Sequence, residues 1–210
     1  MRYAVKEIFY SLQGEGRHTG RPAVFCRFAG CNLWSGREQD RATAACNFCD
    51  TDFVGVDGQR GGRFADARSL ADAVEQAWGD GSGARFVVLT GGEPLLQVDA
   101  ALLSALRDLR FEIALETNGT LAAPGGIDWI TVSPKGTEPL AQATGDELKL
   151  VFPQAGVDPA SFEHLAFDHF LLQPRDGPDR ESNTAAAVAY CLRHPRWHLS
   201  LQTHKFLGIP

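Results

Sequence analysis

The chain has 210 residues, of which 44% are hydrophobic and 22% are charged, and its formal net charge is −6. So high an apolar share with so small a net charge excludes a disordered chain, and no apolar run reaches the roughly 18 residues that a membrane span needs. The charged first residues are unlike a secretion signal, and the acidic balance argues against a surface for nucleic-acid backbone. We therefore expect a single cytoplasmic domain over residues 1–210.

The hydrophobic pattern along the chain is strand, long loop, and then alternating helix and strand. Residues 3–10 and 23–29 alternate as strands, and a loop rich in Gly, Asp and Arg follows over about residues 30–62. The expected helices lie at residues 69–78, at residues 100–109 with Asp99 as N-cap, and from an Asn183 cap to Arg193. The expected later strands lie at residues 85–90, 111–116, 129–133, 147–152, 169–173 and 197–202.

Apolar runs at residues 86–89 and 170–172 are typical of strands covered on both faces, as in a parallel sheet. Because the first strands and the long loop use residues 1–62, too few residues remain for a closed eight-unit barrel, which takes about 250. The sequence therefore predicts an α/β fold. We expect a partial, open β/α barrel of about six parallel strands with added N-terminal and C-terminal strands.

Polar turns follow four of the predicted strands, at residues 90–93, 116–119, 133–135 and 173–176. Each turn alone is explained by the turn propensity of Gly, Pro, Asn and Asp. The carboxyl ends of parallel strands, however, meet at one edge, where ligands bind. With charges on Glu93, Glu116 and Lys135, the four turns predict one extended small-molecule site.

Four of the five cysteines lie close together, in the pattern Cys31-x14-Cys46-x2-Cys49 with Cys26 just upstream. An odd number of cysteines without a secretion signal argues against a disulfide framework. Two metal chemistries compete. A structural zinc site takes four thiolate or imidazole ligands, whereas an iron–sulfur cluster held by three thiolates leaves one iron open.

The alternation of the second strand bears on this choice, because it places Cys26 on the core face with Val24 and Phe28, and Arg27 on the opposite face. Three cysteines then remain, too few for a closed zinc site unless His18 supplies the fourth ligand. We therefore favour a cluster over zinc. Cys191, in the last predicted helix, is assigned to packing.

At this point the motifs resemble a known family. Three clustered cysteines ending in Cys46-Asn-Phe-Cys49, followed by Gly91-Gly-Glu-Pro94, resemble the radical S-adenosylmethionine (SAM) superfamily. Within it, the segments at residues 7–16, 20–27, 30–32, 49–51, 116–119, 133–135 and 202–205 resemble the 7-carboxy-7-deazaguanine synthase family. One departure is the spacing: the superfamily usually has three residues between its first two cysteines, so residues 34–45 read as an insertion.

The resemblance implies a radical lyase that contracts the ring of 6-carboxy-5,6,7,8-tetrahydropterin to 7-carboxy-7-deazaguanine with release of ammonia, on the pathway to the tRNA base queuosine. It implies a [4Fe–4S] cluster and SAM, which together supply the carbon radical, and Mg²⁺. A flavodoxin-like electron donor and a homodimer are the implied partners. Two alternatives stay open: another radical SAM enzyme, such as a glycyl-radical activase, and a non-catalytic zinc module with Cys26 as fourth ligand.

The resemblance also implies the site residues. The cluster ligands are Cys31, Cys46 and Cys49, and Thr51 is placed at the Mg²⁺. The SAM site comprises Phe48, Gly92, Glu93, Glu116, Ser133, Pro134, Lys135, Gln173, Pro174, Arg175 and Asp176. The substrate site comprises Leu12, Gln13, Gly14, Glu15, Arg27, Thr90, His204 and Pro210.

Some of these assignments have simpler alternatives. Arg27 suits a pterin carboxylate as a bidentate partner, but it could instead pair with Glu7 or Glu15. Asp50 and Thr51 could simply cap a turn. The C-terminal residues 203–210 are apolar enough to dock, which would bring His204 and the Pro210 carboxylate to the substrate, or they could dock for stability alone.

Overall fold

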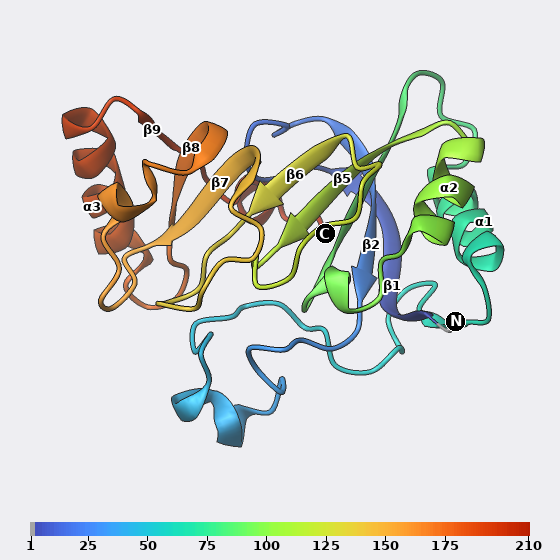
Figure 1. Cartoon of the computed structure of the whole chain (residues 1–210), viewed down its shortest axis with the longest axis horizontal. Helices are drawn as coiled ribbons and strands as arrows, with labels where there is room; N and C mark the ends of the chain where they lie inside the picture. The colour runs from blue at the N-terminus through green and yellow to red at the C-terminus, as the bar shows by residue number, and fades with distance from the viewer. Residues whose placement is uncertain (1–2) are drawn as a thin grey trace.

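The computed structural model describes residues 3–210, and a nine-stranded sheet runs through it (Figure 1). The strand order is β3-β1-β2-β4-β5-β6-β7-β8-β9. The strands are β1 (Tyr3–Leu12), β2 (Pro22–Phe28), β3 (Gly62–Phe64), β4 (Arg85–Gly91), β5 (Phe111–Thr117), β6 (Trp129–Val132), β7 (Thr144–Phe152), β8 (Ala166–Pro174) and β9 (Trp197–Leu199).

The sheet is mostly parallel and open, as the sequence predicts. All neighbours from β2 to β9 pair in parallel, whereas β1 pairs antiparallel with both β2 and β3. The two edges are β3 and β9, which do not pair with each other, so the barrel is partial. The short β3 lies at the end of the expected loop and was not predicted, and β9 stops at Leu199 rather than continuing to Gln202.

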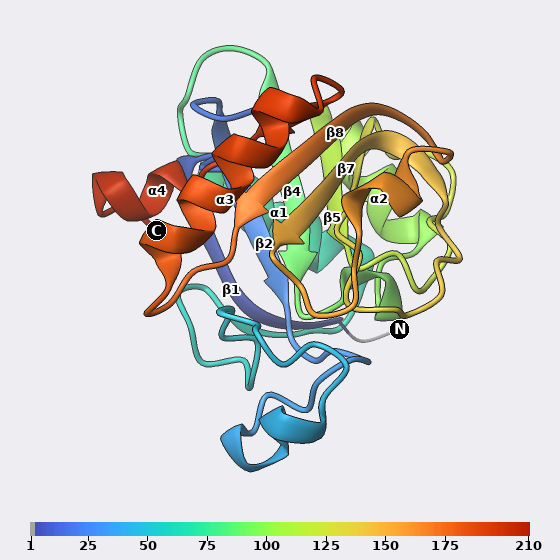
Figure 2. The ribbon, with the colours of Figure 1, turned by 90° about the vertical axis from the view of Figure 1, so that its left-hand side faces the viewer.

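The helices pack on the outside of the two ends of the sheet (Figures 1 and 2). Helices α1 (Ala67–Trp78) and α2 (Ala100–Asp108) pack together over β1, β2 and β5. At the other end, α3 (Arg180–Arg193) packs on β8 and β9. Between β5 and β8, the described crossovers hold only the 3₁₀ turn η3 (Pro159–Phe162), so the middle strands are joined by loops. None of the helices described for residues 3–210 has the length and apolar character to cross a membrane.

Of the two helix N-caps that the sequence predicts, Asp99 and Asn183, the structure confirms the first and not the second. Asp99 accepts a hydrogen bond from the backbone N–H of Leu102 at 3.0 Å, which confirms it as the N-cap of α2. The predicted cap at Asn183 is wrong, because α3 already begins at Arg180. Asn183 lies in the first turn, where its side-chain amide donates to the carbonyl of Arg175 at 2.9 Å and so ties the helix to the end of β8.

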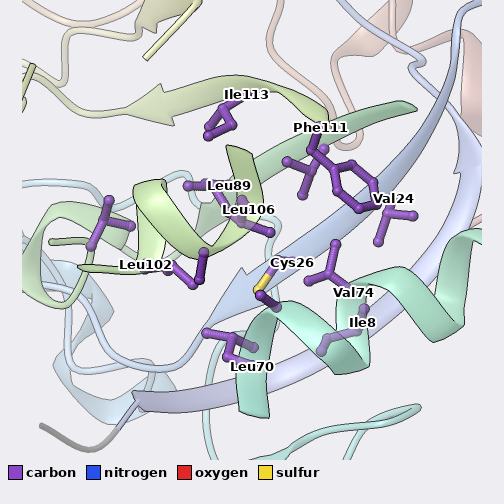
Figure 3. Packing of buried hydrophobic residues seen from close by; sticks show 14 of the residues in the cluster. Ile8, Val24, Cys26, Leu70, Val74, Leu89, Leu102, Leu106, Phe111 and Ile113 are labelled. Carbon is purple, nitrogen blue, oxygen red and sulfur yellow. The ribbon is translucent and has the colours of Figure 1, made fainter. Parts of the chain in front are cut away.

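The core lies between the outer face of the sheet and the helices. Cys26 is fully buried there with Val24 and Phe28, beneath Leu70 and Val74 of α1 (Figure 3). This confirms the face that the alternation of β2 predicts for Cys26. The inner face is different: it carries a smaller aromatic cluster and, further along the strands, charged side chains. The inner face is therefore available for a polar site.

Candidate functional site

A cavity of about 330 Å³ opens on the inner face of the sheet, at the carboxyl ends of the parallel strands. Its walls come from the strands, from the cysteine loop after β2 and from residues 202–210 at the C-terminus. Every predicted site residue lines this cavity except Glu93 and Pro134. Segments more than 150 residues apart in sequence, such as Glu15 and Gln202, meet here through a hydrogen bond of 2.9 Å.

The three cysteines Cys31, Cys46 and Cys49 all line the same cavity, and none forms a disulfide. Burial raises the pKa of Cys31. Interaction between the other two thiols lowers the pKa of Cys49 and raises that of Cys46, which is also buried. The nearby Lys135 ammonium favours the thiolate form of both. The pair therefore holds a partly ionised thiol ready for a metal.

The insertion between the first two cysteines packs against the second half of the cysteine loop, around Trp34. The Trp34 ring lies edge-on to Phe53, with 5.6 Å between centroids, and the Arg41 guanidinium lies 4.1 Å from the Trp34 centroid. Arg41 belongs to the 3₁₀ turn η1 (Glu38–Thr43) and donates to the backbone carbonyls of Asn47, at 3.3 Å, and Cys49, at 2.9 Å. The insertion thus braces the second half of the cysteine loop.

The turn after β4 is pressed against the cysteine loop. Gly92 has no room for a side chain, since a Cβ there would collide with the carbonyl oxygen of Gly30 and lie 2.9 Å from the Cβ of Cys31. Glu93 points away from the cavity and is fully buried. Its carboxylate accepts hydrogen bonds from the Thr117 hydroxyl and the Asn118 backbone N–H, both at 2.8 Å. Glu93 therefore joins this turn to the turn after β5.

The turn after β6 carries a positive charge that acts on the cysteine thiols. The Lys135 ammonium donates to the Ser133 hydroxyl at 2.6 Å and lies 5.8 Å from the centre of the Phe48 ring. Pro134, between them, is buried away from the cavity and accepts a bond from Gln154 at 3.2 Å. The ring and the ammonium together form a wall that suits an aromatic or anionic group.

The floor of the cavity is a charged network centred on Lys149 of β7, whose side chain is 5% exposed. Its ammonium forms a short bond to Glu15 and lies 4.0 Å from Glu116. Burial disfavours the charge of Glu15, but Lys149 outweighs it and lowers the pKa of Glu15 to about 2. Glu116 also accepts bonds from Gln13 at 3.0 Å and Thr90 at 3.3 Å. The floor therefore presents fixed carboxylate acceptors.

Arg27 and the C-terminal segment complete the walls. The Arg27 guanidinium lines the cavity while its Nε donates to Glu7 at 2.8 Å, so the simpler pairing considered for this residue does form. The segment after β9 turns into the short helix α4 (Thr203–Leu207) and docks, as expected. The His204 side chain packs against Gly14, and the Pro210 carbonyl oxygen accepts a bond from Ser11 at 2.9 Å.

Comparison with known proteins agrees with these features. The sequence profile of the radical SAM superfamily matches residues 39–149. Curated proteins named 7-carboxy-7-deazaguanine synthase are 65% identical in Bordetella pertussis and 63% identical in Caulobacter vibrioides, each over 210 residues and the whole of both chains. The crystal structure of QueE from Escherichia coli superposes with a TM-score of 0.68 and 26% identity, covering 97% of this chain and 95% of that one.

The chain belongs to the radical SAM superfamily and, within it, to the 7-carboxy-7-deazaguanine synthase family. The superfamily match begins after Cys31, within the insertion, so the first predicted ligand lies outside the matched residues.

The thiols present fit the cluster that a radical SAM enzyme carries. Three of them line one cavity, and Cys26 is fully buried on the opposite face of β2, so it does not complete a four-thiol zinc site. Within residues 3–210, no three His, Cys, Asp or Glu side chains are placed to share one metal ion. Three thiolates leave one corner of a cluster open for a non-protein ligand.

Several cavity residues were missed by the sequence analysis: Glu7, Phe9, Phe25, Lys149, Gln202 and Lys205. A signal for Lys149 existed, because Glu147, Lys149 and Val151 alternate with the core residues Leu148 and Leu150 along β7. Lys205 belongs to the segment 202–205 that carries part of the family resemblance, but no strand or helix period placed its side chain in the cavity. Its position depends on where the C-terminal segment docks, which the sequence pattern does not specify.

Proposed function

We propose that the chain catalyses the ring contraction of 6-carboxy-5,6,7,8-tetrahydropterin to 7-carboxy-7-deazaguanine, with release of ammonia. The observation that carries this proposal is that three free thiols and a floor of fixed carboxylates share one cavity of about 330 Å³. A cavity of this size takes small molecules. The groups that line it match the two requirements of the reaction, which are a site for the cluster and a polar site for a pterin.

The cluster would be held by Cys31, Cys46 and Cys49, and SAM would lie between it and the turns after β4, β6 and β8. Gly92 keeps the turn after β4 close to the cysteine loop, so that backbone groups can approach SAM. Lys135 and Ser133 would bind its anionic and hydroxyl groups. The turn Gln173–Asp176 lines the same wall and would close over it. When bound, cluster and SAM supply the carbon radical that protein side chains cannot.

The substrate would lie deeper, over the floor. Gln13 and the ionised Glu15 offer an acceptor-rich edge to the N–H groups of a pterin ring. Arg27 would bind the pterin carboxylate through its terminal nitrogens, since its Nε is already bonded to Glu7. Leu12, Gly14, Thr90, His204 and Pro210 line the surrounding wall.

We also propose a Mg²⁺ ion at Thr51, which lies two residues after Cys49 in the cysteine loop and lines the cavity. A hard cation with few protein ligands would bridge to substrate oxygens. Chelating divalent ions from the assay should then raise the KM for the pterin and lower the turnover, and added Mg²⁺ should restore both. Thr51→Ala should weaken the response to Mg²⁺ while the iron content stays the same. A Mg²⁺-independent rate in both proteins would contradict this role.

The proposed enzyme also needs an electron donor, a compartment and an oligomeric state. A flavodoxin-like protein would supply the electron, and two copies would form a homodimer. Five free cysteines support a reducing compartment such as the cytoplasm. Residues 1–210 would act as one domain, since a single sheet contains residues from Tyr3 to Leu199.

The deciding experiment is a reconstitution assay. Anaerobically purified protein, with cluster reconstituted, is incubated with the carboxypterin, SAM and dithionite, and the product is identified by mass. We expect a mass loss of one ammonia from the substrate and visible absorption from the cluster. Cys46→Ala should abolish both, whereas Cys26→Ala, which alters only the core, should retain the absorption. A colourless protein that contains one zinc ion would overturn the proposal.

A further inference from the structure

The ammonium of Lys205 joins two separate walls of the cavity. Its Nζ lies 2.6 Å from Asp50 Oδ2 and 2.6 Å from Asp176 Oδ2. Asp50 directly follows Cys49 in the cysteine loop, and Asp176 ends the turn after β8. The Lys205 side chain is 29% exposed, so these bonds are partly shielded from solvent. One side chain of α4 thus connects the wall of the cluster ligands to the wall opposite.

The same segment also reaches the floor. The side-chain amide of Gln202 donates to Asp50 at 3.1 Å and to Glu15 at 2.9 Å. The backbone N–H of Thr203 donates to the carbonyl of Gly14 at 2.8 Å. The bonds from Thr203 to Gly14 and from Gln202 to Glu15 anchor the backbone of this segment independently of the two aspartates. The Lys205 ammonium is then held by its two ion pairs, on a backbone that is itself anchored to the floor.

The Lys205 ammonium balances the negative charges of Asp50 and Asp176, and this affects the distance between the two walls that carry them. Without the Lys205 ammonium, the carboxylates of Asp50 and Asp176 would lose the cation that pairs with both of them, and like charges repel. The Arg180 guanidinium would still favour the charge of Asp176. The hydrogen bond from Lys205 lowers the pKa of Asp176, which keeps that carboxylate ionised. Loss of the ammonium would therefore push the two loops apart.

We propose that Lys205 is a positioning residue that sets the distance between the cysteine loop and the turn Gln173–Asp176. The inference rests on the proposed function, in which SAM lies between these two walls and the substrate lies on the floor that the same segment contacts. Removing the ammonium should misplace SAM relative to the substrate. A displacement of about 1 Å at a reacting centre can cost on the order of 100-fold in rate.

The test compares Lys205→Met with Lys205→Arg in cluster-loaded enzyme. For Lys205→Met we expect the dissociation constant of SAM to rise about tenfold, measured by equilibrium binding without reductant. With dithionite as electron source, we also expect more 5′-deoxyadenosine released per molecule of product. Lys205→Arg keeps the charge and should restore both values to within about threefold. Arg193→Met, at the exposed end of α3, is the matched control and should behave as wild type.

Asp50→Asn removes the same ion pair by neutralising the partner of Lys205. If Lys205 acts through Asp50, the double variant Lys205→Met/Asp50→Asn should bind SAM no more weakly than Lys205→Met alone. Additive losses would overturn the proposal, as would a Lys205→Met enzyme equal to the Arg193→Met control. Should Lys205→Met lose its iron, Asp50→Asn decides: it must weaken SAM binding at full iron content.

Failure of the proposed function gives a different result. If wild-type enzyme makes no deazaguanine product, the proposed reaction falls, but SAM binding still measures the effect of Lys205. If wild type makes product and Lys205→Met makes it with unchanged SAM affinity and unchanged 5′-deoxyadenosine release, only the role of Lys205 falls.

Discussion

The buried ammonium of Lys149 is the residue on which the floor of the cavity depends. Three carboxylates surround it: Glu15, Glu116 and Glu147. Burial disfavours its charge, but these carboxylates outweigh that cost and raise the pKa of Lys149. A buried ion pair of this kind contributes little compared with an apolar pair, but breaking it by removing one partner is costly.

Lys149→Met should therefore destabilise the protein by up to about 3–5 kcal/mol near pH 8, because it leaves Glu15, whose side chain is 17% exposed, without a cation. In the wild type, Glu15 has a pKa of about 2, so its contribution is complete above its ordinary value near 4.5. In the variant, burial alone would raise that pKa, so Glu15 should take up a proton as the pH falls from 8 to 5. The difference in free energy of unfolding, measured with urea, should shrink over this range.

Two variants control this prediction. Lys149→Met/Glu15→Gln should be more stable than Lys149→Met at pH 8, because the amide carries no buried charge. Lys6→Met removes a lysine whose partners Asp52 and Asp57 are largely exposed, so it should cost less. A wild-type-to-variant difference that is constant with pH would show that Glu15 is not the group responsible.

From the residue identities, the metal-binding chemistry of this site could be predicted more completely than its network of ion pairs. The role of Cys26 followed from the two-residue period of a strand and is confirmed by its burial with Val24 and Phe28. The same period places Glu147 and Lys149 on one face. Which face is inside an open barrel, however, depends on where the helices pack, and that is not a property of β7 alone. The carboxylates Glu15 and Glu116 of the floor were predicted, but Lys149, the cation between them, was missed for this reason.

At the scale of elements, the turn after β4 shows how close packing fixes the site. Gly91 adopts a φ of +134°, and both it and Gly92 lie against the backbone of residues 28–30. Glu93 continues the contact through a hydrogen bond from its backbone N–H to Gly30, at 2.9 Å. The position of Cys31 therefore depends directly on this turn.

Gly92→Ala should weaken assembly of the cluster, because the added methyl group collides with the Gly30 carbonyl and the Cys31 Cβ. Overpacking of this kind typically costs about 1–3 kcal/mol. We expect less iron per chain after reconstitution and faster loss of visible absorption in the presence of a chelator. Gly125→Ala is the control, since a Cβ at that position meets open space. Equal iron content in the two variants would mean that the cysteine loop moves freely enough to absorb the methyl group.

Element boundaries were predictable where a side chain caps the backbone locally and less so elsewhere. Asp99 was identified from its place before an apolar helix. Asn183 looked like a similar cap, but its amide bonds to Arg175 in the loop before α3, a tertiary contact that no local pattern reveals. The path of the insertion was also unpredictable, because it depends on the packing of Arg41 on Trp34 and on two backbone carbonyls.

For the whole molecule, the open barrel explains why the C-terminal segment matters. Helices cover the two ends of the outer face, and the edges β3 and β9 are not paired, so the barrel stays open between them. Residues 200–210 bond to the start of the chain, through Ser200 to Gly16, Thr203 to Gly14 and Pro210 to Ser11. The fold class followed from the count of strands against chain length, but closure by the C-terminus depends on long-range contacts.

Deletion of Ile209 and Pro210 should separate binding from stability. The segment keeps its bonds at Ser200 and Thr203 and its ion pairs at Lys205, so the melting temperature should change by no more than a few degrees. The substrate should bind about tenfold more weakly, because Pro210 lines the cavity and the bond proposed between its carboxylate and the substrate is lost. A hydrogen bond to a charged group contributes about 1.5–3 kcal/mol. Equilibrium binding of the carboxypterin without reductant measures this. Replacing Ile209 with Ala keeps Pro210 and should leave the affinity for the carboxypterin near that of wild type. If this variant binds as weakly as the deletion, the effect comes from packing of the segment. Unchanged affinity in the deletion would place the Pro210 carboxylate outside the substrate site.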